Sequence, residues 1–153
     1  MQLSEVFLRF QEDAFKQLLR SISMGKLKTY QLFERLKTRL HLHKLNTETL
    51  RNAAPRLRER LAEHDEELAT DLSQAILVSH LDMIVAVLNF LGIPHDDGFF
   101  AKDVDATPYL TEGWQARVFE QFRNDYPLPL LTFYINHLTL ELAQTQALFA
   151  PAA

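Results

Sequence analysis

The longest apolar run in the chain sets the strongest limit on its fold. The run covers residues 72–92 (LSQAILVSHLDMIVAVLNFLG), ends in Gly92 and is soon followed by Pro94. A glycine just past a helix, with a proline shortly after it, is a typical helix stop signal. A single β-strand of about 20 residues would be far longer than strands usually are. We therefore predict a central helix over residues 72–91, enclosed by the other helices.

A membrane span would have a similar length, because about 20 apolar residues cross a bilayer. The run contains His80, Asp82 and Asn89, and a charge such as Asp82 near the centre of a span costs about 2.5–3.5 kcal/mol on insertion scales. The first residues (MQLSE) lack the basic and apolar regions of a signal peptide, and the chain has no cysteine. We therefore expect a cytoplasmic protein without a membrane segment.

Apolar side chains recur at helical spacing on both sides of the central run. This spacing predicts further helices over residues 3–24 (stopped by Gly25), 29–40, 46–72, 114–126 and 129–149. Pro55 either kinks the third of these helices or begins a new one. Residues 92–111 form a connection that is long for a compact domain, and its aromatic side chains favour an ordered loop folded back on the core.

The expected fold class is therefore all-α, a single-domain bundle of five to six helices around the central helix. The length of 153 residues suits one domain over residues 1–153, since a domain of this size buries roughly 70% of its unfolded surface. Within it we distinguish a basic helical part, at about 14–60, from a second part at about 61–149. The second part holds the central helix, the loop and the C-terminal helices.

The net charge of −4 conceals an uneven distribution. Residues 14–60 contain twelve Lys/Arg and three Glu, whereas residues 61–153 contain three Lys/Arg and fourteen Asp/Glu. Such a split between halves indicates either an anionic partner or attraction between the halves, within one molecule or between subunits.

A nucleic-acid partner is one way to use the positive charge. Residues 29–61 are expected to form a helix, a short turn and a second helix, as in groove-reading proteins. The side chains that could contact phosphates are Lys37, Arg39, Lys44, Arg51, Arg56, Arg58 and Arg60. Pro55 would disturb the second helix, and only Tyr30 and Phe33 in this segment could stack on bases.

Metal chemistry has four candidate residues, His80, His95, His137 and Glu141. His137 and Glu141 are spaced i,i+4 and could bind one ion from one helix face, as in a metal-dependent hydrolase. With Tyr134 they could equally form a polar stripe that faces solvent. Glu-x-x-His and His-Glu-x-x-His motifs are absent, so we predict no metal and no cofactor.

Motifs of nucleophilic or phosphate-binding enzymes are also absent from the sequence, including Gly-x-Ser-x-Gly, the P-loop and Gly-x-Gly-x-x-Gly. The leading hypothesis is a non-enzymatic interaction, scaffold or regulatory protein that self-associates as a homodimer or binds another protein. It rests on the apolar surplus of the first and last helices and on the complementary charges. A nucleic-acid-binding regulator is the second hypothesis, and an α-helical metal-dependent hydrolase is the third.

Overall fold

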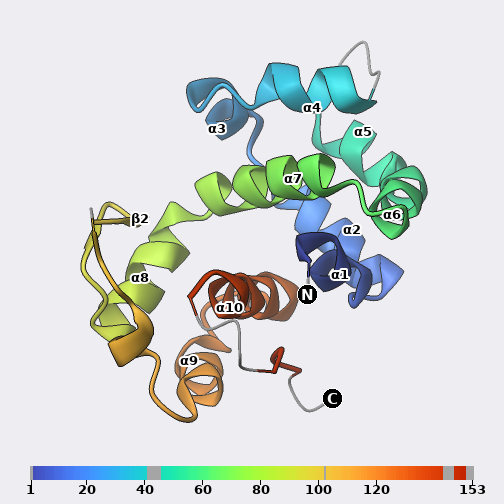
Figure 1. Cartoon of the computed structure of the whole chain (residues 1–153). Coiled ribbons are helices and arrows are strands. Elements are labelled where there is room, and N and C mark those ends of the chain that lie inside the picture. The colour runs from blue at the N-terminus through green and yellow to red at the C-terminus, as the bar shows by residue number, and fades with distance from the viewer. Residues whose placement is uncertain (1, 41–45, 102, 143–146, 151–153) are drawn as a thin grey trace. The chain divides into compact units, whose positions relative to one another are not determined.

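The computed structural model describes residues 2–40, 46–101, 103–142 and 147–150 (Figure 1). In this part of the chain it contains ten α-helices, one short 3-10 helix and one two-stranded hairpin, which confirms the predicted all-α class. The chain forms two compact units, Met1–Ser79 (unit 1) and His80–Ala153 (unit 2). The single domain over residues 1–153 stays a prediction.

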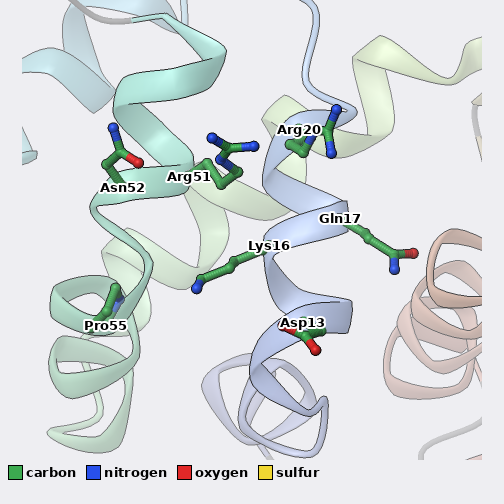
Figure 2. A pocket seen from close by; sticks show the side chains of 7 residues that line it. All are labelled: Asp13, Lys16, Gln17, Arg20, Arg51, Asn52 and Pro55. Atoms are coloured by element: carbon green, nitrogen blue, oxygen red, sulfur yellow. The ribbon is translucent and has the colours of Figure 1, made fainter.

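Unit 1 is built around one long apolar helix, α7. The helices α1, α3, α4 and α6 all contact α7. α2 packs against α5 and α6 (Figure 2). Leu68, Leu72 and Ile76 of α7 are fully buried. The helices of unit 1 are α1 (Leu3–Leu8), α2 (Glu12–Arg20), α3 (Met24–Thr29), α4 (Phe33–Leu40), α5 (Thr47–Asn52), α6 (Ala54–Ala62) and α7 (Glu66–Ser79).

The prediction of one continuous helix over residues 72–91 is wrong, because the helix breaks at His80. The His80 backbone has φ −131° and ψ 41°, which is not helical. The Ser79 hydroxyl donates to the carbonyl of Ala75 (2.7 Å) and accepts from the backbone N–H of Ser23 (2.8 Å). A serine that bonds in this way to its own helix competes with the backbone ladder and bends it. The apolar run therefore supplies two helices, α7 and α8 (Leu81–Leu91).

Local polar contacts also divide the predicted helix over residues 3–24 into shorter ones. The Ser21 hydroxyl donates to the Leu18 carbonyl (2.7 Å) at the end of α2, and the Ser23 hydroxyl caps α3 by accepting from the N–H of Lys26 (3.3 Å). Gly25 lies inside α3 rather than after a helix, so the predicted stop at Gly25 is wrong. The expected count of five to six helices is too low because this helix and two others that were predicted to be continuous are divided.

The predicted helix over residues 46–72 divides at two further points. α5 ends at Asn52, and Pro55 stands in the first turn of α6, where its missing N–H costs no hydrogen bond. Pro55 therefore lies at the start of a new helix and does not kink a continuous one, which was the other alternative. α6 then ends before His64, whose φ of 62° is left-handed.

Unit 2 begins with α8, which ends as predicted at Gly92. Gly92 has φ 79°, and the N–H of Ile93 bonds to the Leu88 carbonyl at 3.0 Å, the usual closure of a helix by glycine. The other elements of unit 2 are β1 (His95–Asp96), β2 (Phe99–Phe100), the 3-10 helix η1 (Thr107–Tyr109), α9 (Trp114–Phe122) and α10 (Leu128–Leu142).

The connection after α8 is ordered around a short hairpin. β1 and β2 are antiparallel, with His95 opposite Phe100. A Cβ on Gly98 would lie 3.4 Å from the side chain of Ile84 and 3.5 Å from that of Leu81, so the turn of the hairpin packs on α8. The loop therefore folds back at Gly98, and Leu110 is buried as well, but the expected covering of the core by aromatic side chains is wrong at Phe99, Phe100 and Tyr109, which are exposed.

Residues 147–150 are tied back to α10 and are not helical. The N–H of Phe149 donates to the Asn136 side-chain oxygen at 2.6 Å, and the Asn136 amide donates to the Phe149 carbonyl at 3.1 Å. The predicted extension of the last helix to residue 149 is therefore wrong at Phe149.

In the described part of the chain, no single helix is both long and apolar enough to cross a membrane; α7 and α8 reach that length and composition only when they are taken together across their break.

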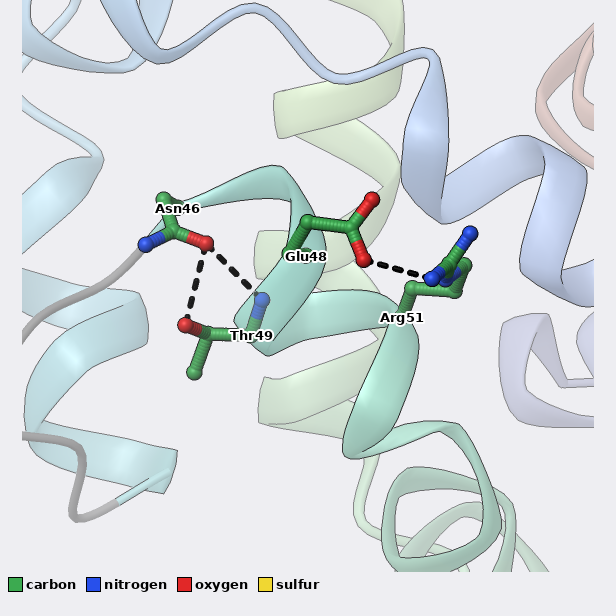
Figure 3. Close-up of polar contacts among 4 residues, drawn as sticks. All are labelled: Asn46, Glu48, Thr49 and Arg51. Atoms are coloured by element: carbon green, nitrogen blue, oxygen red, sulfur yellow. Dashed lines mark hydrogen bonds and ion pairs between the residues drawn. The ribbon is translucent and has the colours of Figure 1, made fainter.

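The first prediction concerns the start of α5. The Asn46 side-chain oxygen accepts from the Thr49 N–H (2.9 Å) and from its hydroxyl (3.0 Å), which caps the helix (Figure 3). Replacing a capping Asn by Ala typically costs about 1 kcal/mol. We expect Asn46→Ala to lower the free energy of unfolding by about 1 kcal/mol in urea titrations followed by circular dichroism, without a change in slope.

Asn52→Ala is the matched control, because Asn52 is exposed at the other end of α5 and makes no side-chain hydrogen bond within the described part of the chain. Its unfolding midpoint should equal or exceed that of the original protein. An Asn46→Ala midpoint equal to that of the control would contradict the capping role.

Candidate functional site

Unit 1 contains a polar groove between α2 and the α5–α6 pair, with a volume of about 560 Å³ (Figure 2). α2 lines it with Asp13, Lys16, Gln17 and Arg20. The opposite wall is formed by Arg51 and Asn52 of α5 and by Pro55 of α6. We call this space the basic groove, since three of its side chains are cationic and one is acidic.

The sequence builds this groove from the polar face of an amphipathic helix. Residues 13, 16, 17 and 20 follow the i, i+3, i+4, i+7 spacing of one helix face. The other face of α2 buries Phe15, Leu18 and Leu19. On the far wall, Leu50 and Leu57 are fully buried and fix α5 and α6 in place. The groove is therefore held by apolar contacts below its polar surface.

Two of the three cations in the basic groove form exposed ion pairs. Lys16 Nζ lies 3.3 Å from a carboxylate oxygen of Glu12, and Arg51 Nη2 lies 2.5 Å from one of Glu48 (Figure 3). The Glu12 and Glu48 side chains are 54% and 62% exposed. Such surface pairs contribute about 0–1 kcal/mol, so both cations remain available to a ligand. Arg20 makes no ion pair with any described residue.

Two of the predicted nucleic-acid contacts are used inside unit 1. Arg58 donates to the Phe10 carbonyl at 2.7 Å, and its guanidinium lies 5.7 Å from the centre of the Phe15 ring. Arg60 donates to the Asp65 carboxylate at 2.6 Å, across the turn between α6 and α7. Both guanidinium groups therefore link helices of the unit.

The other predicted contacts are dispersed over several elements. Arg51 lines the basic groove, Arg56 is exposed on α6, and the Lys37 ammonium lies 6.0 Å from the centre of the Phe33 ring on α4. Lys44 and the side chain of Arg39 lie outside the described part of the chain. The role of these residues in nucleic-acid binding stays a prediction.

Sequence reasoning missed Lys16 and Arg20 because it considered only the apolar face of the first helix. A signal was available: both residues share one helix face with Asp13, within the basic stretch at 14–60. The partner helix, however, is more than 30 residues further along the chain, and a periodicity within one helix does not identify the helix opposite it.

The best-defined of the proposed metal ligands form a pair on α10. His137 Nε2 lies 3.3 Å from Glu141 Oε1, and the Glu141 side chain is 49% exposed. Partial burial raises the pKa of the Glu141 carboxyl, but the hydrogen bond and the charge of His137 outweigh this effect, so its pKa lies below the usual value. The predicted solvent-facing stripe is wrong at Tyr134, which is buried and whose pKa is raised by that burial and by the charge of Glu141.

The remaining metal candidates lie on other elements. His80 precedes α8, while His95 lies in β1 and is bonded at both ring nitrogens. His95 Nδ1 accepts from the Gly98 N–H (3.0 Å), which leaves Nε2 to donate to the Asn89 side-chain oxygen (2.7 Å). Among the described residues, no three acidic or histidine side chains are grouped in a way that could hold a metal ion.

Unit 2 exposes an unusual set of large apolar side chains. Phe90, Phe99, Phe100 and Tyr109 are between 38% and 49% exposed. Together with Leu128, they are all the exposed large apolar side chains in the described part of the chain. We call the four aromatic residues the aromatic surface.

The aromatic surface lies along α8: Phe99 follows Gly98, whose backbone packs on Leu81 and Ile84 near the start of the helix, whereas Phe90 lies near its end. Phe100 stands opposite His95, which bonds to Asn89, the neighbour of Phe90. The Tyr109 ring lies 3.8 Å from the position that a Cβ on Gly92 would take. The hairpin and the 3-10 helix thus bring aromatic residues to different points along the same helix, α8.

Comparison with protein-family models, with curated protein sequences and with solved structures gives no match to this chain.

The second prediction follows from the pair on α10. The folded-state pKa of Glu141 is lowered, so the stability that the pair contributes is present above the usual carboxyl pKa and is lost as the pH falls through the folded value. In His137→Gln we expect the pKa of Glu141 to rise, because burial then acts without the opposing charge. Carbon-detected NMR of the carboxyl group against pH measures this shift.

His95→Gln serves as the control for the histidine change, since His95 lies on the hairpin and bonds to Asn89 instead. It should leave the pKa of Glu141 unchanged. Equal Glu141 titration curves in the original protein and in His137→Gln would show that His137 does not lower this pKa.

Proposed function

We propose that this chain is a non-enzymatic interaction protein that acts as a homodimer, with the aromatic surface of one copy bound to the basic part (residues 14–60) of the other. The observation that carries the proposal is the exposure of four aromatic side chains in α8 and the segment that follows it, Phe90, Phe99, Phe100 and Tyr109. Burying apolar area gains roughly 25 cal/mol per Å². Aromatic side chains are enriched at the centre of protein interfaces.

Charge favours a second copy as the occupant of this surface. Residues 80–153 contain nine Asp/Glu and three Lys/Arg, whereas residues 14–60 contain twelve Lys/Arg and three Glu. Asp96 and Asp97 lie in the hairpin beside Phe99 and are exposed. Two acidic surfaces would repel each other, but an acidic surface and a basic one attract and align.

The proposal includes a two-fold arrangement of the two copies. In the homodimer that we propose, a two-fold axis relates the copies, so that the aromatic surface of each binds the basic part of the other. The interface is then closed, which gives a dimer rather than an open chain of copies. A dimer with two equivalent contacts also buries both aromatic surfaces at once.

The two alternative functions have less support. A nucleic-acid-binding face would need its cations free, yet Arg58 and Arg60 bond inside unit 1. A metal-dependent hydrolase would need converging ligands, and the described candidates lie on separate elements apart from the pair on α10.

The third prediction tests the dimer by sedimentation equilibrium. We expect the mass to rise from monomer to dimer with protein concentration, and the dimer to weaken as salt screens the charges. Phe99→Ser combined with Phe100→Ser should weaken the dimer at least about tenfold, because two exposed rings are lost from the interface without a change in the core.

Leu128→Ser is the matched control, since Leu128 is also exposed and apolar but lies at the start of α10. It should leave the dimerisation constant within about twofold. A monomeric mass at every concentration overturns the proposal, as does a double variant that dimerises like the control. A dimer that is insensitive to salt overturns the assignment of the basic part as the partner.

A further inference from the structure

We infer that the basic groove of unit 1 binds a phosphate monoester carried on a small, hydroxyl-rich molecule. The groove has a volume of about 560 Å³, and ligand pockets typically span about 300–1,000 Å³. Its walls are three helices of one unit, α2, α5 and α6, and the apolar contacts beneath them are fully buried. The proposal does not depend on the homodimer.

The cations of the groove match a phosphate group. Arg20 and Arg51 stand on opposite walls, and each guanidinium presents a planar fork of N–H donors that suits two phosphate oxygens. Lys16 extends from α2 towards the α5–α6 wall and supplies a third positive charge (Figure 2).

The acidic side chains near these cations do not block an anion. Glu12 and Glu48 are more than half exposed and hold Lys16 and Arg51 only through surface pairs within their own helices. A phosphate dianion that contacts both walls would replace these pairs with hydrogen bonds of the same charge-assisted kind, made to two cations at once. Arg20 has no such pair to break among the described residues.

The rest of the lining selects the body of the ligand. Asp13 supplies carboxylate acceptors, and Asn52 supplies both an amide donor and an acceptor. These groups match hydroxyls. The lining contains no aromatic ring on which a nucleobase could stack, so a sugar or cyclitol phosphate fits better than a nucleotide.

The fourth prediction is tested by isothermal titration calorimetry with the full chain and ribose 5-phosphate. We expect saturable binding, with ribose and inorganic phosphate each binding at least about tenfold more weakly, since each offers only half of the contacts. Arg20→Gln and Arg51→Gln should each weaken binding at least about tenfold, as expected for the loss of a charge-assisted contact.

Arg56→Gln is the matched control, because Arg56 is an exposed arginine on α6 that does not line the groove. It should change the affinity by less than about twofold. Backbone NMR spectra of all three variants should retain the original shift pattern away from the substituted residue, so that a loss of binding reports on the groove.

The source of the phosphate is decided by a second arm, which uses phosphatidylcholine vesicles with and without phosphatidylinositol 4-phosphate. Binding of free ribose 5-phosphate supports a soluble ligand, and binding only to the phosphoinositide vesicles, lost in Arg20→Gln, supports a lipid headgroup. Equal affinity for inorganic phosphate and ribose 5-phosphate overturns the proposal, as does equal loss of binding in Arg56→Gln. Tighter binding of single-stranded DNA than of either monoester also overturns it.

Discussion

The two hydrogen bonds of the Ser79 hydroxyl decide how the most apolar segment of this chain is used. One bond returns to the Ala75 carbonyl within α7, and the other comes from the Ser23 backbone before α3. They fasten the end of α7 to the segment before α3, at the point where the helix ends. The remaining apolar residues then begin unit 2 as α8. Without this break, one helix of about 20 residues would have to be covered along its whole length, and neither unit would have a core of its own.

The sequence predicts the helical content well, because each helix must bury one face in the core and this places apolar residues at helical spacing. The start of α6 at Pro55 and the end of α8 at Gly92 were also predictable, since proline lacks an N–H and glycine tolerates positive φ. The breaks at Ser21 and Ser79 were not, because their hydroxyls end a helix only where the local backbone presents an acceptor or another segment presents a donor. A serine inside an apolar run can therefore either lie within a helix or stand where a helix ends, and its tertiary contacts determine which.

The positive charge of residues 14–60 is divided between structural and accessible groups, which a count of charges cannot show. Arg35 lies 3.6 Å from the buried Asp71 and holds α4 to α7, and Arg58 binds the Phe10 carbonyl. The desolvation of a buried carboxylate is costly unless a cation accompanies it, so Arg35 belongs to the fold. Lys16 and Arg20 make no such contact between helices in the described part of the chain. They line one groove with Arg51 only because α2 and α5, far apart in sequence, pack side by side. For this reason the groove was not predictable from the sequence, whereas the overall basic character was.

The two proposals use the same cations and are therefore thermodynamically linked. Carboxylates of a partner copy and a phosphate monoester would compete for Lys16, Arg20 and Arg51, which belong both to the basic groove and to residues 14–60. A ligand that binds only the unpaired copy favours it by about 2.7 kcal/mol when its concentration is 100 times its dissociation constant. Because one dimer yields two copies, the gain is about 5.4 kcal/mol, or about ten-thousandfold in the dissociation constant of the dimer, enough to convert most of a moderately stable dimer into liganded single copies. Reciprocity requires the converse, so formation of the dimer would weaken the binding of the phosphate. If both proposals hold, a phosphate bound in the basic groove would separate the two copies and leave the aromatic surface of each copy exposed.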